Sequence, residues 1–177
     1  MTREQLEHAI RAACAVSGDS ELLIFGSQAI LGTYPEAPEN LRASVEVDVQ
    51  AKNMPENTDL IDGSLGELSQ FHATHGFYVH GLSIDSAVLP AGWEDRTVPV
   101  KSLRTKGHTG HCLEAHDLAA SKLVANREKD RVFVTTLLLE KLIDPGTLIS
   151  RVSVLPVDAE RIAAISGWVT LIASEVE

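Results

Sequence analysis

Two acidic residues, Glu46 and Asp48, stand two positions apart in the segment Ser-Val-Glu-Val-Asp-Val. On a β-strand, side chains at positions i and i+2 share a face and lie roughly 6.5 Å apart at the backbone. Two carboxylates on one face repel each other, and burying each costs several kcal/mol. We therefore expect them to hold a divalent cation, Mg²⁺ or Mn²⁺, between them. The alternative interpretation is an exposed edge strand with an acidic outer face.

A glycine–serine turn precedes this strand. The apolar run Leu22–Phe25 leads into Gly26 and Ser27, where a short helix is expected to begin. Glycine permits a tight backbone and the close approach of a phosphate, and a helix start offers free N–H groups and a positive dipole end. Any α/β turn can contain Gly-Ser. A Gly-Ser turn that is followed by a strand with paired acids, however, is typical of phosphoryl-transfer enzymes. Such enzymes bind a nucleoside triphosphate through the turn and the acids.

A third carboxylate on a neighbouring strand is common in sites of this class. Asp85, at the end of a predicted strand over 77–85, is our candidate. Its alternative role is that of a turn residue before Ser86. In such a site two cations about 3.5–4 Å apart would activate a 3′-hydroxyl and stabilise the departing pyrophosphate.

Charged residues also gather where two predicted helices meet. Lys122 lies on the apolar face of a predicted helix over 114–126, where a lysine either extends its amine to solvent or meets an anion such as a triphosphate. Arg127, Lys129 and Asp130 follow at the junction. We predict phosphate contacts for the three basic residues, with Asp130 as their polar partner. Structural salt bridges are the alternative for all four residues.

Other kinds of site are not predicted. His108, His111 and Cys112 are close in sequence, but no fourth ligand has the spacing of a structural zinc site. Neither a Ser-His-Asp pattern nor a glycine-rich dinucleotide fingerprint is present. Four other histidines are interpreted as surface or cap residues, namely His72, His75, His80 and His116.

The pattern of elements predicts an α/β (α+β) fold, a mixed sheet flanked by helices with a helical C-terminal part. A capping box at Thr2 and Gln5 should begin a first helix that Gly18 ends. Strands are predicted over 22–25, 43–51, 77–85 and 97–103, and further helices over 64–74, 114–126, 129–143 and 162–176. Asp62-Gly63, Gly107–Gly110 and Pro145-Gly146 are expected to be turns or loops. We place a core domain at 1–110 and a helical part, packed on it, at 111–177.

Composition is ordinary for a soluble globule, with 44% hydrophobic and 23% charged residues among 177. No run of eighteen apolar residues occurs, so we expect no membrane span, and the N-terminus lacks a signal-peptide core. Cys14 and Cys112 are far apart, which favours reduced thiols in a cytoplasmic protein.

Charge is unevenly distributed along the chain. The net charge is −10, yet eight basic and four acidic residues lie between Arg96 and Arg131. Such asymmetry is consistent with contact between this segment and a polyanion. From charge alone a solvated surface is the simpler explanation, because a protein that is acidic overall is a poor nonspecific binder of nucleic acid.

Two motifs in this order resemble those of a known superfamily. Phe25-Gly26-Ser27-Gln28-Ala29 and Glu46-Val47-Asp48-Val49 resemble the hydrophobic-Gly-Ser and acid-x-acid motifs of the DNA polymerase β-like nucleotidyltransferases. The segment from Cys112 to Val134 is similar to the helical part of AbiEii-type toxins and their uncharacterised bacterial relatives. The resemblance covers about residues 20–140.

This resemblance implies transfer of NMP from an NTP to an acceptor with Mg²⁺ as cofactor. In AbiEii-type relatives the acceptor can be the 3′ end of a tRNA, and an antitoxin encoded nearby restrains the activity. Carried over, Gly26 and Ser27 would hold the triphosphate, Glu46 and Asp48 the metals, and Lys122 the phosphates. The chain departs from the superfamily pattern in two ways: Glu46 replaces the more usual aspartate, and the loop from Ser27 to Glu46 is longer than in minimal members.

The first functional hypothesis is therefore a nucleotidyltransferase acting on RNA, as the toxin of a toxin–antitoxin pair. The second is an inactive relative that binds a nucleotide or a protein partner. The third is a structural α/β protein that uses the helix over 162–176 as a dimer seam. An intact third acid within metal-bridging reach of Glu46 and Asp48 would favour the enzyme, whereas a missing third acid or an occluded Gly26-Ser27 pocket would favour the inactive relative.

Overall fold

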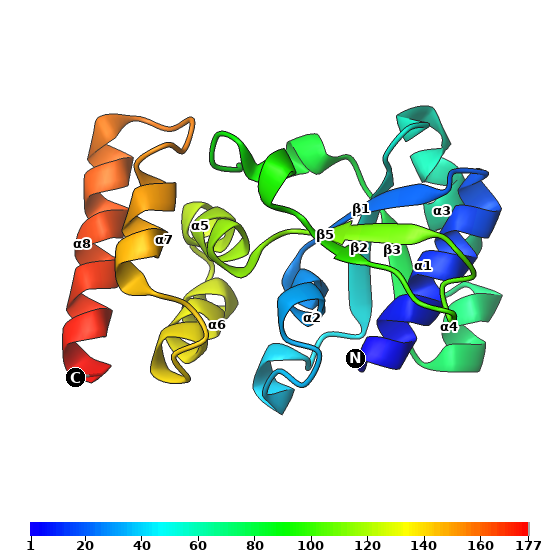
Figure 1. Ribbon diagram of the computed structural model, residues 1–177, viewed down its shortest axis with the longest axis horizontal. Coiled ribbons are helices and arrows are strands. Elements are labelled where there is room, and N and C mark those ends of the chain that lie inside the picture. Colours follow the sequence, from blue (N-terminus) through cyan, green and yellow to red (C-terminus); the bar gives the residue numbers. More distant parts are fainter. Residues whose placement is uncertain (177) are drawn as a thin grey trace. The chain divides into compact units, whose positions relative to one another are not determined.

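The computed structural model describes residues 1–176, which form two compact units. Unit 1 comprises Met1–Ser86 and Thr97–Leu113, and unit 2 comprises Ala87–Arg96 and the chain from Glu114 onward. Unit 1 holds the sheet and unit 2 holds the C-terminal helices (Figure 1). The sequence placed the division between residues 110 and 111 and did not assign 87–96 to the helical part.

Unit 1 is built on a five-stranded mixed sheet with the strand order β3-β2-β1-β5-β4. The central strand β1 pairs antiparallel with β2 and parallel with β5, while β3 runs parallel to β2 and β4 antiparallel to β5. The predicted fold class is confirmed. The strands are β1 Glu21–Phe25, β2 Glu46–Ala51, β3 Tyr78–Gly81, β4 Val98–Val100 and β5 Thr109–Cys112.

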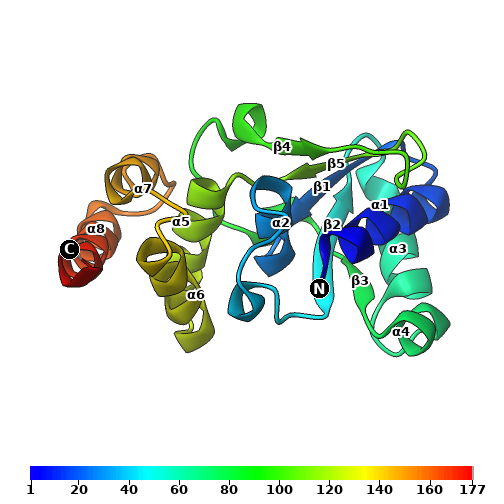
Figure 2. The same ribbon diagram turned by 60° about the horizontal axis from the view of Figure 1, so that its bottom comes forward.

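The two faces of this sheet differ because side chains alternate along each strand. On β2, Val47, Val49 and Ala51 are buried, while Glu46 and Asp48 are only partly buried. Ile24 of β1 lies opposite Val49 and shares the buried face, against which α1 (Arg3–Ser17) and α3 (Thr58–Leu65) pack (Figure 2). The acidic residues consequently project from the opposite face of the sheet.

The first helix forms where the sequence predicts it. Thr2 caps α1 by accepting a hydrogen bond from the Gln5 amide, and the Gln5 side chain accepts one from the Thr2 amide. Gly18 ends the helix in the left-handed conformation, with φ of 72°. The buried positions Leu6 and Ile10 then fix α1 on the sheet.

Three strand predictions and one loop prediction need correction, and the strand predicted over 97–103 covers only Val98–Val100. The strand predicted over 43–51 begins only at Glu46, and the one over 77–85 ends at Gly81. Asp85 lies instead in the 3₁₀ helix η4 (Ile84–Ser86), so its placement on a strand was wrong. The predicted Gly107–Gly110 loop overlaps β5, which pairs with the central strand.

The helix predicted over 64–74 is two shorter helices, α3 and α4 (Gln70–His75). Asp62-Gly63, predicted to be a turn, lies inside α3, which follows the 3₁₀ helix η3 (Pro55–Asn57). The break comes later, where Gly66 ends α3 and Ser69 caps α4 by accepting the His72 amide. The short segments Ser27–Ala29 (η1), Ile30–Thr33 (α2) and Glu39–Leu41 (η2) connect β1 to β2.

Unit 2 contains the 3₁₀ helix η5 (Trp93–Arg96) and the helices α5 Ala115–Ala125, α6 Glu128–Leu139, α7 Pro145–Val152 and α8 Ala159–Val176. Pro145 begins α7 rather than interrupting the chain, because Asp144 caps the helix and proline suits its first turn. Helix α6 buries Phe133, Val134 and Leu137, while its hydrophobic residues Val132 and Leu139 are exposed.

Helix α8 was considered as a dimer seam. Within unit 2 it packs on α6 and α7, and its central residues Ile165 and Val169 are buried there. This face of α8 therefore packs against other helices of the same chain. The side chain of Val176, at the end of the helix predicted over 162–176, lies outside the described part of the chain.

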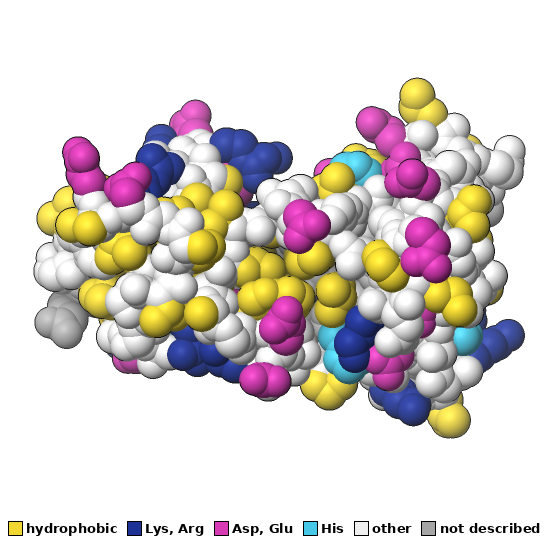
Figure 3. All heavy atoms as spheres, turned by 90° about the horizontal axis from the view of Figure 1, so that it is seen from above, with side chains coloured by type: hydrophobic (Ala, Val, Ile, Leu, Met, Phe, Trp, Pro, Cys, Tyr) yellow, Lys and Arg dark blue, Asp and Glu magenta, His cyan; other side chains and the backbone are white. Residues whose placement is uncertain are grey.

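The surface of unit 2 is mixed in character. Figure 3 shows charged side chains of both signs between hydrophobic ones on the left-hand part of the view, and Val154 and Leu171 are among the exposed hydrophobic residues. Among the described residues, every helix is too short or too polar to span a lipid bilayer.

Candidate metal-binding active site

Three side chains converge on the polar face of the sheet in unit 1. Nδ1 of His80 lies 2.8 Å from Oε1 of Glu46 and 3.1 Å from Oδ1 of Asp48. One ligand atom from each of the three residues falls within 4.8 Å of the other two. The side chains of Glu46, Asp48 and His80 are 34%, 23% and 37% exposed, so the group is open to solvent.

Strand pairing produces this group. Glu46 and Asp48 share a face of β2 because they are two positions apart. The parallel strand β3 places His80 directly opposite Asp48, and Tyr78 opposite Glu46. Paired residues in neighbouring strands project from the same face, so a histidine more than thirty positions away in sequence meets both acids.

Gly26 closes the site on its other side. Asp48 lies opposite Phe25, the last residue of β1, so the turn at Gly26 passes directly beside the Asp48 carboxylate. A Cβ atom on Gly26 would lie 2.0 Å from Oδ2 of Asp48. With φ of 67° and ψ of −172°, Gly26 also adopts a conformation that is essentially restricted to glycine. The turn at Gly26 and the acid pair therefore pack directly against each other.

The electrostatics of the group are those of an anion pair that needs a positive partner. Burial and the Glu46 carboxylate raise the pKa of Asp48 to about 6, although the hydrogen bond from His80 opposes this shift. Burial disfavours the charged form of His80, but its contacts with Asp48 and Glu46 outweigh burial and raise its pKa. Burial and Glu46 also raise the pKa of Tyr78 to about 12, which keeps that phenol neutral.

The buried side chain of Gln28 stabilises the turn at Gly26. Its side chain is fully buried, and Nε2 donates a hydrogen bond of 3.0 Å to the carbonyl of Ser44, just before β2. This contact ties the short helix after Gly26 to the start of the acid-bearing strand. Gln28 belongs to the motif noted in the sequence, but no role was predicted for it. Ser27, predicted to bind phosphate, is half-buried at the first position of η1.

The structure does not bring Asp85 into this group. Asp85 is exposed, and its carboxylate accepts a hydrogen bond of 3.3 Å from Ser83 within the same turn. In the described part of the chain, the position on the strand beside Glu46 and Asp48 is occupied by His80. Sequence reasoning interpreted His80 as a surface residue. The alternation of Tyr78 and His80 along one predicted strand was the available signal.

The predicted phosphate-binding residues form a second cluster, within unit 2. Nζ of Lys122 lies 3.3 Å from Oδ1 of Asp130 and 4.5 Å from the centre of the Phe133 ring. Arg127 Nε donates a 2.6 Å hydrogen bond to Oδ2 of Asp130, while Lys129 is exposed. Asp130 is fully buried. The cluster thus contains the salt bridges that the sequence offered as the alternative to phosphate contacts.

Ionisation of this cluster follows from its geometry. Burial lowers the pKa of Lys122, partly countered by Asp130. Burial opposes ionisation of Asp130 too, but the hydrogen bond from Arg127 and the charge of Lys122 outweigh it and lower its pKa. Asp130 therefore stays a carboxylate that holds the ends of α5 and α6 together.

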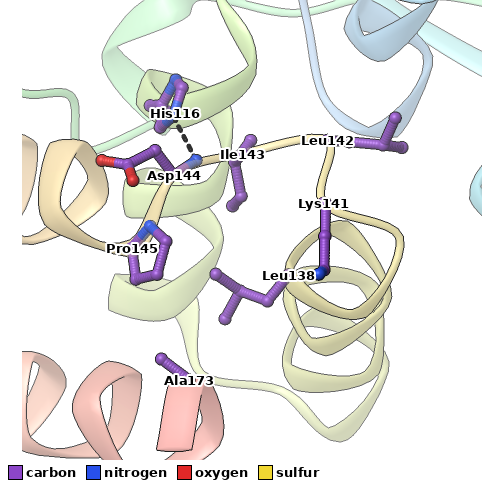
Figure 4. A pocket seen from close by; sticks show the side chains of 8 residues that line it. All are labelled: His116, Leu138, Lys141, Leu142, Ile143, Asp144, Pro145 and Ala173. Carbon is purple, nitrogen blue, oxygen red and sulfur yellow. Dashed lines mark hydrogen bonds between the residues drawn. The ribbon is translucent and has the colours of Figure 1, made fainter. Parts of the chain in front are cut away.

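Unit 2 also contains a hollow of about 700 Å³ between the end of α6, the start of α7 and α8 (Figure 4). His116 faces it, with Nε2 accepting the Asp144 amide and Nδ1 contacting Oε1 of Glu114 at 2.7 Å. The Asp144 carboxylate caps α7 through the Thr147 amide. The polar groups of His116 and Asp144 thus form hydrogen bonds that stabilise the segment leading into α7.

The donor set of Glu46, Asp48 and His80 fits a divalent cation. Two adjacent ligands of an octahedral ion at about 2.1 Å lie about 3 Å apart, and the distances from His80 Nδ1 to the two carboxylates are 2.8 and 3.1 Å. The partial exposure of all three side chains leaves room for further ligands such as water or phosphate oxygens. These three side chains could therefore hold a divalent cation.

Comparison with known proteins agrees with this geometry. Neither the curated proteins nor the solved structures give a match. A family profile described as "Nucleotidyltransferase of unknown function (DUF6036)" matches residues 4–163, which include the Gly26 turn, the acid pair, His80 and the Lys122–Asp130 cluster. The chain belongs to this family of nucleotidyltransferases, DUF6036.

Proposed function

We propose that the protein is a metal-dependent nucleotidyltransferase that moves NMP from an NTP to an RNA acceptor, using Mg²⁺ or Mn²⁺ bound at Glu46 and Asp48. The observation that carries the proposal is the contact between the acid pair and the Gly26 turn, where a side chain would lie 2.0 Å from Asp48. A mixed sheet of this topology does not in itself require a glycine packed against a partly exposed carboxylate. A nucleotide-binding turn that lies beside a metal site requires such a contact between the glycine and the acid.

Each residue has a defined task in this proposal. Glu46 and Asp48 would bind the cation from one face of β2, and Gly26, whose missing side chain leaves room for the Asp48 carboxylate, would bring the phosphate-binding turn beside that cation. Ser27 offers a hydroxyl to the triphosphate. A bound divalent cation would supply the positive charge that activates an acceptor hydroxyl and stabilises the leaving pyrophosphate. Lys122, Arg127 and Lys129 are proposed to contact phosphates, with Asp130 orienting the first two.

RNA as the acceptor is supported by the helical segment. Residues from Cys112 to Val134 resemble the corresponding part of AbiEii-type toxins, whose acceptor can be a tRNA 3′ end, and the basic stretch Arg96–Arg131 suits a polyanion. On this basis we propose a toxin that acts on tRNA or another RNA and is restrained by an antitoxin protein.

The second candidate is an inactive relative that binds a nucleotide or a protein, and it is favoured by the lack of a third acid beside Glu46 and Asp48 among the described residues. His80 contacts both carboxylates directly. As an imidazolium it would balance one of the two negative charges without a metal, which would favour a binding protein with no transferase chemistry.

Labelling experiments separate these candidates. The purified protein is incubated with each radiolabelled NTP, total RNA and Mg²⁺ or Mn²⁺, and the labelled RNA species are identified by gel and sequencing. We expect transfer by the wild-type chain and at least a roughly 100-fold loss in Asp48→Ala, since one metal ligand is removed. Asp59→Ala, which removes an exposed aspartate at the start of α3, is the matched control.

Circular dichroism and thermal unfolding establish that the Asp48→Ala variant is folded. Labelling that persists at the wild-type level in folded Asp48→Ala eliminates the proposed site. Absence of labelling by the wild-type chain with every NTP and both metals, together with nucleotide binding, supports the inactive relative instead.

A further inference from the structure

The third position of the acid site is a nitrogen donor. Glu46 and Asp48 lie on one strand. His80, on the neighbouring strand directly opposite Asp48, completes the group. Among the described residues, the acid that the sequence offered for this position, Asp85, lies beyond the strand in an exposed turn. The site therefore offers two oxygen ligands and one imidazole nitrogen.

The orientation of the ring is suitable for coordination. Nδ1, rather than a carbon edge, faces both carboxylates at 2.8 and 3.1 Å. These are the separations expected for neighbouring ligands of one octahedral ion, about 3 Å. A cation placed among the three atoms would take the place of the proton that His80 now shares with Glu46 and Asp48.

Ligand type affects metal preference. Mg²⁺ is a hard ion that binds oxygen and rarely accepts nitrogen, whereas first-row transition-metal ions accept imidazole readily. Mn²⁺ has nearly the same size and octahedral geometry as Mg²⁺, so it fits wherever Mg²⁺ fits and gains the nitrogen bond in addition. A carboxylate at the position of His80 would not make this distinction.

We propose that His80 is the third metal ligand and makes the site selective for Mn²⁺ over Mg²⁺. This inference rests on the proposed function only in placing a cation at Glu46 and Asp48. It adds that a transition metal, held through Nδ1 of His80, is the resident ion.

Mn²⁺ binding can be measured without any nucleotide. The full-length protein is titrated with Mn²⁺ alone, free Mn²⁺ being followed by its electron paramagnetic resonance signal, and Mg²⁺ is then added as a competitor. We expect Mn²⁺ to bind at least about tenfold more tightly than Mg²⁺. His80→Asp, which supplies a third carboxylate, should reduce this preference to less than about threefold while retaining binding of both ions.

Pulsed electron paramagnetic resonance tests the bond itself, because a coordinated imidazole nitrogen modulates the Mn²⁺ echo. We expect this modulation in the wild-type chain and in the control His108→Ala, which removes a histidine from the loop before β5. It should be absent in His80→Asp and His80→Ala.

The inference would be overturned by no nitrogen modulation in the wild-type chain, by modulation that persists in His80→Asp, or by equal affinity for the two ions. Failure of Mn²⁺ to bind at all would also overturn it and would assign His80 the role of a permanent counterion. These outcomes are distinct from failure of the proposed function, in which Mn²⁺ binds through His80 but no nucleotide is transferred.

Discussion

The carboxylate of Asp48 occupies the space in which a side chain on Gly26 would begin, with Oδ2 at 2.0 Å from the position of such a Cβ atom. Asp48 and Gly26 are 22 positions apart in the sequence, and the antiparallel pairing of β1 with β2 brings them into contact. The glycine is thus required by the acid as well as by its own backbone conformation.

Gly26→Ala should therefore disable the site. The new methyl group displaces Asp48, and the backbone conformation adds about 1–3 kcal/mol of strain. We expect loss of Mn²⁺ binding and of nucleotide transfer, with a fall in unfolding free energy measured by urea denaturation. Gly18→Ala is the control for replacing a glycine at positive φ without a clash, because a Cβ atom at Gly18 would meet nothing within 4 Å. Equal metal binding by the Gly26→Ala and wild-type chains would contradict this account.

Asp85→Ala tests the acid that the sequence placed in the site. Because its carboxylate is exposed and contacts Ser83 in a local turn, its removal should change Mn²⁺ affinity and transfer rate by less than about twofold. Isothermal titration with Mn²⁺ and the RNA-labelling assay give both quantities. A loss as large as that caused by Asp48→Ala would return Asp85 to the site as a ligand.

Asp130→Asn should destabilise the protein strongly. It leaves the buried amine of Lys122 without its carboxylate, a change that typically costs about 3–5 kcal/mol. Chemical denaturation measures the loss, with Glu128→Gln, an exposed acid on the same helix, as the control. Adding Lys122→Met removes the buried positive charge, so the double variant should recover part of the stability. A double variant less stable than Asp130→Asn would show that Lys122 does not depend on this pairing.

Stability should fall in acid through the same carboxylate. The pKa of Asp130 is lower in the folded protein than the value of about 3.9 in an unfolded chain, because of Arg127 and Lys122. Its contribution is therefore complete above pH of about 4 and is lost as pH falls through the lowered value. We expect unfolding free energy, measured from pH of about 7 down to about 2.5, to decline less steeply in Asp130→Asn than in the wild-type chain. Parallel curves for the two proteins would rule out this contribution.

Local sequence patterns predicted a large part of the fold. The alternation of valines with Glu46 and Asp48 defines the two faces of β2, because side chains on a strand alternate regardless of what surrounds it. The capping box at Thr2 and the glycine at position 18 define α1 through hydrogen bonds between close neighbours in the chain. Such features depend on a few adjacent residues and can be recognised from them.

The incorrect predictions occur where contacts between residues far apart in the sequence determine the local structure. Strand β5 is short and contains Gly110, so its pattern resembles a loop; pairing with the central strand β1 makes it a strand. Gly63 is compatible with a helix because α3 packs on β3 and α1, which compensates for a poor helix former. The end of β3 at Gly81, which moves Asp85 off the sheet, likewise has no signal in the segment itself.

The sequence by itself determined that a Gly-Ser turn precedes a strand with two acids on one face, since both features follow from the geometry of a single chain segment. Only the tertiary structure decided that His80 completes this group and that Asp48 packs against Gly26. Both contacts depend on the register between strands, which is set by the packing of the whole sheet and not by any one of its strands.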